Sequence, residues 1–174
     1  MIGLFFGDTK FPKQVLKKIK HNNMRYLIMD LSKNKIFKKD PYSQSISIGQ
    51  FGKIFNYLKQ KKCKQILFAG KINKPKFSTL KLDFKGIYYL PKILKAAKLG
   101  DAAILKAIID ILAMEKIKVI SSIKYNPELT LSKGLFTKTK PNKNDMISIK
   151  NGIKSLKRVN PNNHVQGLIV QNSN

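Results

Sequence analysis

Short apolar runs alternate with amphipathic segments along most of the chain. Residues 2–6, 24–29 and 65–69 stay largely apolar and then meet a turn, which is typical of strands buried in a parallel sheet. Shorter segments at 45–48, 118–120 and 167–170 also favour strands. We therefore expect a sheet of short, largely buried strands.

Between these runs, apolar residues recur every three or four positions, which predicts amphipathic helices. The expected helices lie at residues 12–20, around 54–58, and at 90–98, 101–114 and 144–158, with a single helical turn at 127–129. Asp101 is expected to be an N-cap, whose carboxylate would accept from backbone N–H groups. The last helix is expected to turn four apolar residues toward the core: Ile147, Ile149, Ile153 and Leu156.

The alternation of strands and helices predicts the fold class. Helices that connect successive strands indicate parallel βαβ units, because a parallel pair needs a crossover between its strands. We therefore expect an α/β fold of three layers, with a mostly parallel, Rossmann-like sheet flanked by helices. The chain has 174 residues and 43% hydrophobic content, which is enough for one domain and a buried core.

The charge of the chain is strongly positive. It carries 35 basic and 9 acidic residues, a formal net charge of +26. All the basic residues except Arg25 and Arg158 are lysines, spread from Lys10 to Lys157. Such a charge favours nucleic acid or anionic membranes as partners, but specific nucleic-acid contacts rely more on arginine. We interpret the charge as a compositional bias that makes the surface attract anions, and expect no specific nucleic acid.

Few side chains suit metal or nucleophilic chemistry. Cys63 is the only cysteine, so no internal disulfide forms, and a reducing compartment is expected. Its lysine neighbours would lower its pKa, but no histidine is near in sequence, and we interpret it as an incidental thiol. His21 and His164 stand in polar turns and are expected to be solvated. One cysteine and two distant histidines do not make a zinc site.

The chain has no stretch that predicts a membrane span. No uninterrupted apolar run reaches the roughly 18 residues that a span needs, and no signal peptide precedes Gly3. Together with the single cysteine, this predicts a cytoplasmic protein that contacts a membrane at its surface at most.

The strongest candidate site lies where predicted strands end or helices begin. The carboxyl ends of parallel strands share one edge of a sheet, and helix N-termini there favour anions. The chain has no dinucleotide fingerprint and no Walker-type loop, so the pattern predicts only a pocket for a phosphorylated ligand. Its members are Gly7 and Asp8, residues 49–52, Gly70 and Lys71 with Lys74, and Gly100 with Asp101.

The same edges carry motifs in a characteristic order. Residues 3–12 read Gly-Leu-Phe-Phe-Gly-Asp-Thr-Lys-Phe-Pro, and residues 48–53 read Ile-Gly-Gln-Phe-Gly-Lys. Residues 69–75 read Ala-Gly-Lys-Ile-Asn-Lys-Pro, with Leu82-Asp83 after them. Residues 100–105 read Gly-Asp-Ala-Ala-Ile-Leu, and Leu135-Phe136-Thr137 precedes Pro141. In this order and spacing the chain resembles, over nearly its whole length, the N-terminal domain of the LpxI-type UDP-2,3-diacylglucosamine pyrophosphatases.

The chain departs from the family pattern at three places. Thr9 stands at the second glycine of the opening motif, and Ala102 at the second aspartate of the Gly-Asp-Asp motif. Gln166-Gly167 stands where the family has Gly-Gln.

The resemblance implies a Mg²⁺-dependent hydrolase of lipid A and lipopolysaccharide biosynthesis in Gram-negative bacteria. Members hydrolyse UDP-2,3-diacylglucosamine to UMP and 2,3-diacylglucosamine 1-phosphate (lipid X). They work at the cytoplasmic face of the inner membrane, so the resemblance implies a peripheral membrane protein, and it is compatible with a homodimer. By the same resemblance, Gly7, Asp8, Gly70 and Lys71 would hold phosphate or sugar, and Asp101 would shape that pocket.

The resemblance also implies that the catalytic aspartate lies in a second domain, beginning near Gly167. We therefore expect an N-terminal α/β substrate-binding domain at 1–159, and a linker and the start of a truncated catalytic domain at 160–174. No catalytic residue is assigned in this chain, and the metal ligands are left open.

Three readings of the function remain open. The chain is either a hydrolase in its own right or a catalytically inactive fragment that binds ligand. A basic nucleic-acid-binding protein is the third reading, and its affinity for any duplex would fall steeply with salt.

Overall fold

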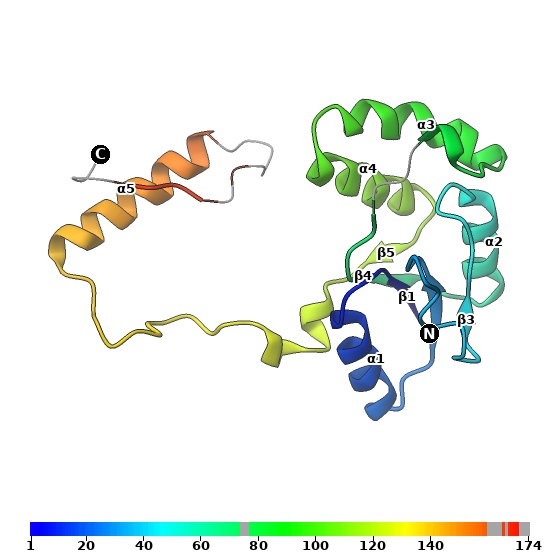
Figure 1. The fold of residues 1–174 in the computed structure, drawn as a ribbon, viewed down its shortest axis with the longest axis horizontal. Coiled ribbons are helices and arrows are strands. Elements are labelled where there is room, and N and C mark those ends of the chain that lie inside the picture. The colour runs from blue at the N-terminus through cyan, green and yellow to red at the C-terminus, as the bar shows by residue number, and fades with distance from the viewer. Residues whose placement is uncertain (74–76, 160–164, 166, 171–174) are drawn as a thin grey trace.

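A single parallel sheet forms the centre of the protein. The computed structural model describes residues 1–73, 77–159, 165 and 167–170. Its sheet has the strand order β3-β2-β1-β4-β5, and every pairing is parallel, as the sequence predicts (Figure 1). The strands are β1 (Ile2–Phe6), β2 (Tyr26–Asp30), β3 (Ser43–Gln44), β4 (Gln65–Ala69) and β5 (Lys118–Val119).

Five α-helices and three short 3₁₀ helices are assigned within the described residues. The α-helices are α1 (Phe11–His21), α2 (Phe51–Gln60), α3 (Phe84–Ala97), α4 (Asp101–Met114) and α5 (Lys143–Val159). The 3₁₀ helices are η1 (Phe77–Thr79), η2 (Ser122–Lys124) and η3 (Pro127–Leu129).

One predicted strand is not assigned, and another strand and one helix have other bounds than predicted. The third strand lies at Ser43–Gln44, before the predicted segment 45–48, and no strand is assigned to residues 167–170. The third helix begins at Phe84, not at residue 90, so Pro91 lies inside the helix and not in its first turn. It begins early because the Asp83 carboxylate caps it by accepting from the N–H of Gly86.

Apolar side chains cover both faces of the sheet, and this arrangement makes the three layers. On one face Leu4 and Phe6 pack with Val15 and Ile19 of α1. On the other face β1, β2 and β4 pack against α2 and α4. The helix α3 packs chiefly on α4 and α2, and it lies on the outer side of α4 (Figure 1).

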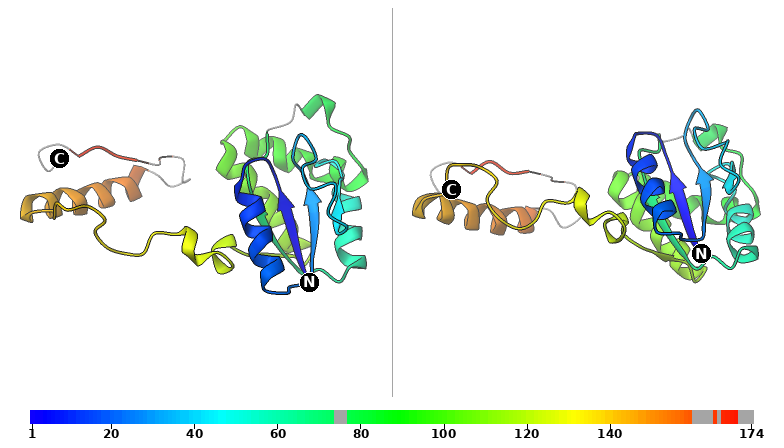
Figure 2. Two further views of the ribbon diagram at one scale, coloured as in Figure 1. Left: turned by 60° about the horizontal axis from the view of Figure 1, so that its bottom comes forward. Right: turned by 90° about the horizontal axis from the view of Figure 1, so that it is seen from below.

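The last helix does not join this core. No residue of α5 is buried, and the views in Figure 2 show it apart from the sheet, after an extended segment. The prediction that its apolar residues face the core is therefore wrong for Ile147, Ile149 and Ile153, which are about half exposed. The α5 helix instead lies against residues 168 and 170. A Cβ added at Gly152 would come close to the Val170 side chain.

In the part of the chain that the structure describes, none of the helices combines the length and apolar character that crossing a bilayer requires.

Candidate functional site

The loops that follow β1 and β4 are bonded to each other at the carboxyl edge of the sheet. The N–H of Gly7 donates to the carbonyl of Ala69 at 2.9 Å. Asp8 and Lys71 then form a two-way bridge, with N···O distances of 2.8 and 2.9 Å. Four of the five predicted site residues therefore lie in one pair of loops.

Gly7 and Gly70 make this pairing possible. A Cβ on Gly7 would lie 2.2 Å from the carbonyl oxygen of Lys71, and a Cβ on Gly70 would lie 2.3 Å from that of Asp8. Gly70 also has a φ of +86°, which favours glycine. The space beside each glycine is thus filled by the opposite loop.

The Asp8 carboxylate links a third loop to this pair. It accepts from the N–H of Lys33 at 3.2 Å and from the side-chain amide of Asn73 at 3.4 Å. Asp8 thereby connects the loops that follow β1, β2 and β4.

Asp30 holds that third loop, and sequence reasoning missed it. Its side chain is fully buried and accepts from the N–H and the hydroxyl of Ser32 and from the N–H of Phe37. The signal in the sequence is a carboxylate directly after an apolar run, with a serine two positions later, which is typical of a side chain that organises its own turn.

Thr9 occupies a backbone conformation that glycine prefers. Its φ is +95°, which is rare and costly for a β-branched residue. It stands where the related motif has its second glycine, so the loop keeps the glycine-like geometry although the residue has changed.

An apolar cavity of about 490 Å³ opens beside these loops. Apolar side chains from α3, α4, the start of α2 and the turn before it line the cavity, among them Ile48, Phe51, Leu90, Ile104 and Ile108. Its polar lining comes from Lys71, Asn73 and Asp101.

The structure thus brings Lys71 and Asp101 to one cavity. Asp8 is connected to this cavity through Asn73, whose side-chain amide donates to the Asp8 carboxylate. Gly70 contributes to an adjoining cavity of about 250 Å³, which shares Phe51, Ile72 and Ile108 with the first. Gly7 lines neither cavity. Lys74 falls outside the described residues.

The prediction that Asp101 caps α4 is wrong. Gly100 is the N-cap, with a φ of +108°, and no side chain caps the helix. Asp101 is the first helical residue, where its carboxylate is stabilised by the positive end of the helix dipole while it lines the cavity.

The Asp83 carboxylate holds the loop at residues 49–52 in place, beside the start of α2. The Asp83 carboxylate accepts from the N–H of Lys53 at 2.9 Å and from that of Gly86 at 2.8 Å, so it joins the starts of α2 and α3. Burial acts to raise the pKa of Asp83, but the N–H groups of Lys53, Gly86 and Gly52 outweigh it and the pKa lies below its ordinary value. Gly86 is needed because a Cβ there would meet the carbonyl oxygen of Gly49 at 2.0 Å.

The remaining candidates take no part in this site. Cys63 is buried, and burial raises the pKa of its thiol, so the expected effect of its lysine neighbours is absent. His21 is exposed, as predicted, and lies beside the Asn22 side chain. His164 falls outside the described residues.

The described residues hold no cluster of metal-ligating side chains. Among residues 1–73, 77–159, 165 and 167–170, no three His, Cys, Asp or Glu side chains lie close enough to hold a metal ion. The Asp8 carboxylate is already engaged by N–H donors of Lys33 and Asn73. No chemical step is therefore assigned to a metal bound by these residues.

Two comparisons with known proteins show which proteins the chain is related to. Residues 1–129, which include the whole sheet and the cavity, match the model of the LpxI N-terminal domain family. Over 170 residues the chain is 28% identical to the UDP-2,3-diacylglucosamine pyrophosphatase LpxI of Caulobacter vibrioides. That alignment covers 97% of this chain and 61% of the relative, so the chain spans about three fifths of the relative's length. The chain belongs to the LpxI family, through its N-terminal domain.

Proposed function

We propose that residues 1–129 bind UDP-2,3-diacylglucosamine for hydrolysis of its pyrophosphate to UMP and lipid X. The cavity carries this proposal, because it is apolar within and has Lys71, Asn73 and Asp101 in its lining. An acylated sugar phosphate has the same division, with acyl chains that avoid water and a polar head that needs charged and hydrogen-bonding partners. The relative from Caulobacter bears the name of this activity.

The roles of the individual residues follow from their positions. Lys71 would offer its ammonium to a phosphate or to the sugar, and Asp101 would shape the same edge of the cavity. Asp8 would position Asn73 and the Lys33 backbone, because its carboxylate accepts from both. Gly7 and Gly70 would contribute by holding the two loops together.

The remaining parts of the proposal rest on the family. They are a place in lipid A biosynthesis, Mg²⁺ dependence with ligands outside the described residues, and work at the cytoplasmic side of the inner membrane. A homodimer and the domain boundary at residue 159 also stay predictions.

Binding tests the proposal directly. We expect the chain to bind UDP-2,3-diacylglucosamine in calorimetry, and Leu105→Trp to weaken binding at least about tenfold, because the indole would fill the cavity that Leu105 lines. Ile109→Trp is the matched control, since Ile109 lies on the same helix outside the cavity lining. Equal affinity for both variants would contradict the assignment of the cavity.

A turnover assay separates a binding domain from an enzyme. The chain is incubated with UDP-2,3-diacylglucosamine and Mg²⁺, and UMP is measured. Because no catalytic residue is assigned in this chain, we expect binding without UMP. Sustained release of UMP would show that the chain is a hydrolase by itself.

A further inference from the structure

The helix α3 is apolar on two opposite faces. Its inner face is buried against α4 and α2 through Tyr89, Ile93 and Ala96. The opposite face carries large apolar side chains that are open to solvent. Phe84 is 88% exposed, Tyr88 68% and Ile87 61%.

These exposed residues form one continuous stripe. Phe84, Ile87, Tyr88 and Pro91 follow the spacing of three and four residues that places side chains on one side of a helix. We call them the outer face of α3. An ordinary surface helix would carry polar residues there, and a contiguous exposed apolar stripe indicates a surface with a partner.

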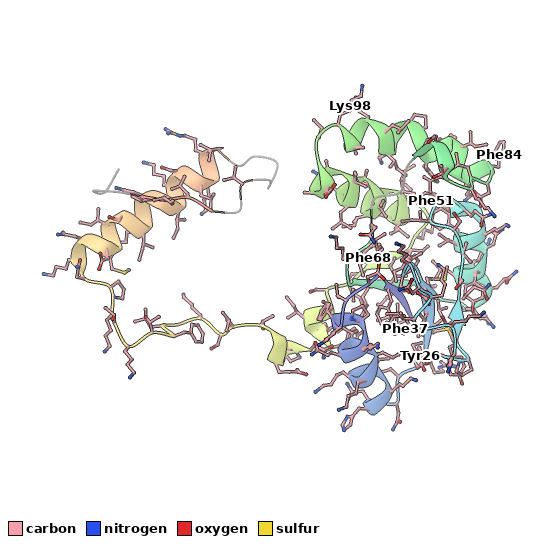
Figure 3. The ribbon with its side chains drawn as sticks, in the orientation of Figure 1. Tyr26, Phe37, Phe51, Phe68, Phe84 and Lys98 are labelled. Carbon is pink, nitrogen blue, oxygen red and sulfur yellow. The ribbon has the colours of Figure 1, made fainter. Side chains whose placement is uncertain are left out.

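Lysines continue this stripe toward the end of the helix. Lys92, Lys95 and Lys98 are all exposed, and no acidic residue occurs between Phe84 and Gly100. Figure 3 shows Phe84 and Lys98 at opposite ends of α3, on the outside of the molecule. The outer face is therefore aromatic, and lysines continue it toward the end of the helix.

The charge decides between the partners that an apolar stripe could have. A second copy of this chain would bring another net charge of +26 to the contact, which opposes association. Nucleic acid would satisfy the lysines but leave Phe84 and Ile87 in water. An anionic bilayer satisfies both, because aromatic side chains enter the interface while lysines meet the headgroups.

We propose that the outer face of α3 docks this domain on an anionic lipid bilayer. The inner side of the same helix lines the cavity through Gly86, Leu90 and Ile93, so docking would hold the cavity next to the bilayer. The significance of that closeness rests on the proposed function, since a diacylated ligand resides in a membrane. The docking itself is measured without any nucleotide.

The absence of tryptophan from the chain allows a site-specific test. Phe84→Trp places a single indole on the outer face of α3. Its emission should shift to the blue, and brominated lipids should quench it, when vesicles of phosphatidylglycerol and phosphatidylethanolamine are added. Leu131→Trp is the matched control, because Leu131 is 83% exposed and lies outside α3. We expect no shift from that variant.

Every outcome of this test is informative. A shift confined to Phe84→Trp supports the proposal. Equal shifts at both positions indicate unspecific adsorption and overturn it, as does a shift without lipid that grows with protein concentration, which would indicate a second copy. Vesicle binding without a shift at Phe84→Trp would place the docking surface elsewhere, and absence of vesicle binding would reject docking altogether.

Charge variants separate the effect of the lysines near the end of α3 from the effect of the overall positive charge. Lys95→Gln with Lys98→Gln should reduce binding to the anionic vesicles about tenfold. Lys13→Gln with Lys17→Gln removes the same charge from exposed positions on α1 and should have a much smaller effect. Equal losses would overturn the proposal. Vesicle binding that persists while calorimetry finds no affinity for UDP-2,3-diacylglucosamine would reject the proposed function and leave the docking surface in place.

Discussion

At the carboxyl edge of the sheet, contact between loops requires glycine at single positions. Gly7 and Gly70 face each other's loops at distances that no side chain would permit, and Gly70 also needs a positive φ. In the folded chain, each of these glycines is a point where the two loops contact each other.

This contact predicts the cost of an added methyl group. We expect Gly70→Ala to lower the free energy of unfolding by about 3 kcal/mol, because it combines an unfavourable φ with a collision against Asp8 and Pro12. Gly100→Ala is the control, since Gly100 has a φ of +108° but no atom within 4 Å of an added Cβ. It should cost about 1 kcal/mol. Urea unfolding measures both, and equal losses would show that the loop contact contributes nothing.

At the scale of elements, one carboxylate organises the starts of two helices. Asp83 accepts from the first turns of α2 and α3, and this explains why α3 begins six residues before the sequence pattern suggested. The resulting helix start closes one side of the cavity, since Leu82 and Gly86 both line it.

Removing this carboxylate should therefore destabilise the fold. We expect Asp83→Ala to lower the free energy of unfolding by about 2 kcal/mol, the upper range for loss of an N-cap, because two helices lose an acceptor. Asp110→Ala, which removes an exposed carboxylate from α4, should change it by less than about 0.5 kcal/mol. A loss no larger than the control's would contradict the double cap.

The contribution of the Asp83 carboxylate to stability depends on pH with a definite sign. The folded-state pKa of Asp83 is lowered, so its contribution to stability is fully present above the ordinary carboxyl pKa near 4 and is lost as the pH falls through the folded value. We expect the stability advantage over Asp83→Asn to be constant near neutral pH and to shrink in acid. An advantage that grows as the pH falls would contradict this assignment.

At the scale of the whole molecule, the core and the last helix are separate. The two apolar clusters draw their residues from the segment between Ile2 and Tyr125, whereas no residue of α5 is buried. The stabilising burial of apolar surface is therefore concentrated in the part of the chain that matches the family model.

Truncation tests how far the cooperative unit extends. We compare a chain ending at Thr130 with one ending at Val159 by thermal unfolding. Because no residue of α5 is buried in the core, we expect both to unfold cooperatively, with midpoints that differ by less than about 2 °C. A clearly lower midpoint for the shorter chain would support a domain that extends to residue 159.

The sequence by itself determined the class of the fold and the set of loops at its edge. Local periodicity of apolar residues predicts buried strands and amphipathic helices, which is why β1, β2, β4 and α4 lie where the pattern predicts. The motifs around Gly7, Gly70 and Asp101 likewise lie in consecutive residues, so they could be read without coordinates.

Only the tertiary structure decided what those residues contact. Asp83 meets Lys53, and Asp8 meets Lys33, across separations of 30 and 25 residues, which no local pattern encodes. Amphipathic periodicity also gives the faces of a helix but not their partners. It therefore could not show that α5 stays outside the core or that α3 leaves a second apolar face open to solvent.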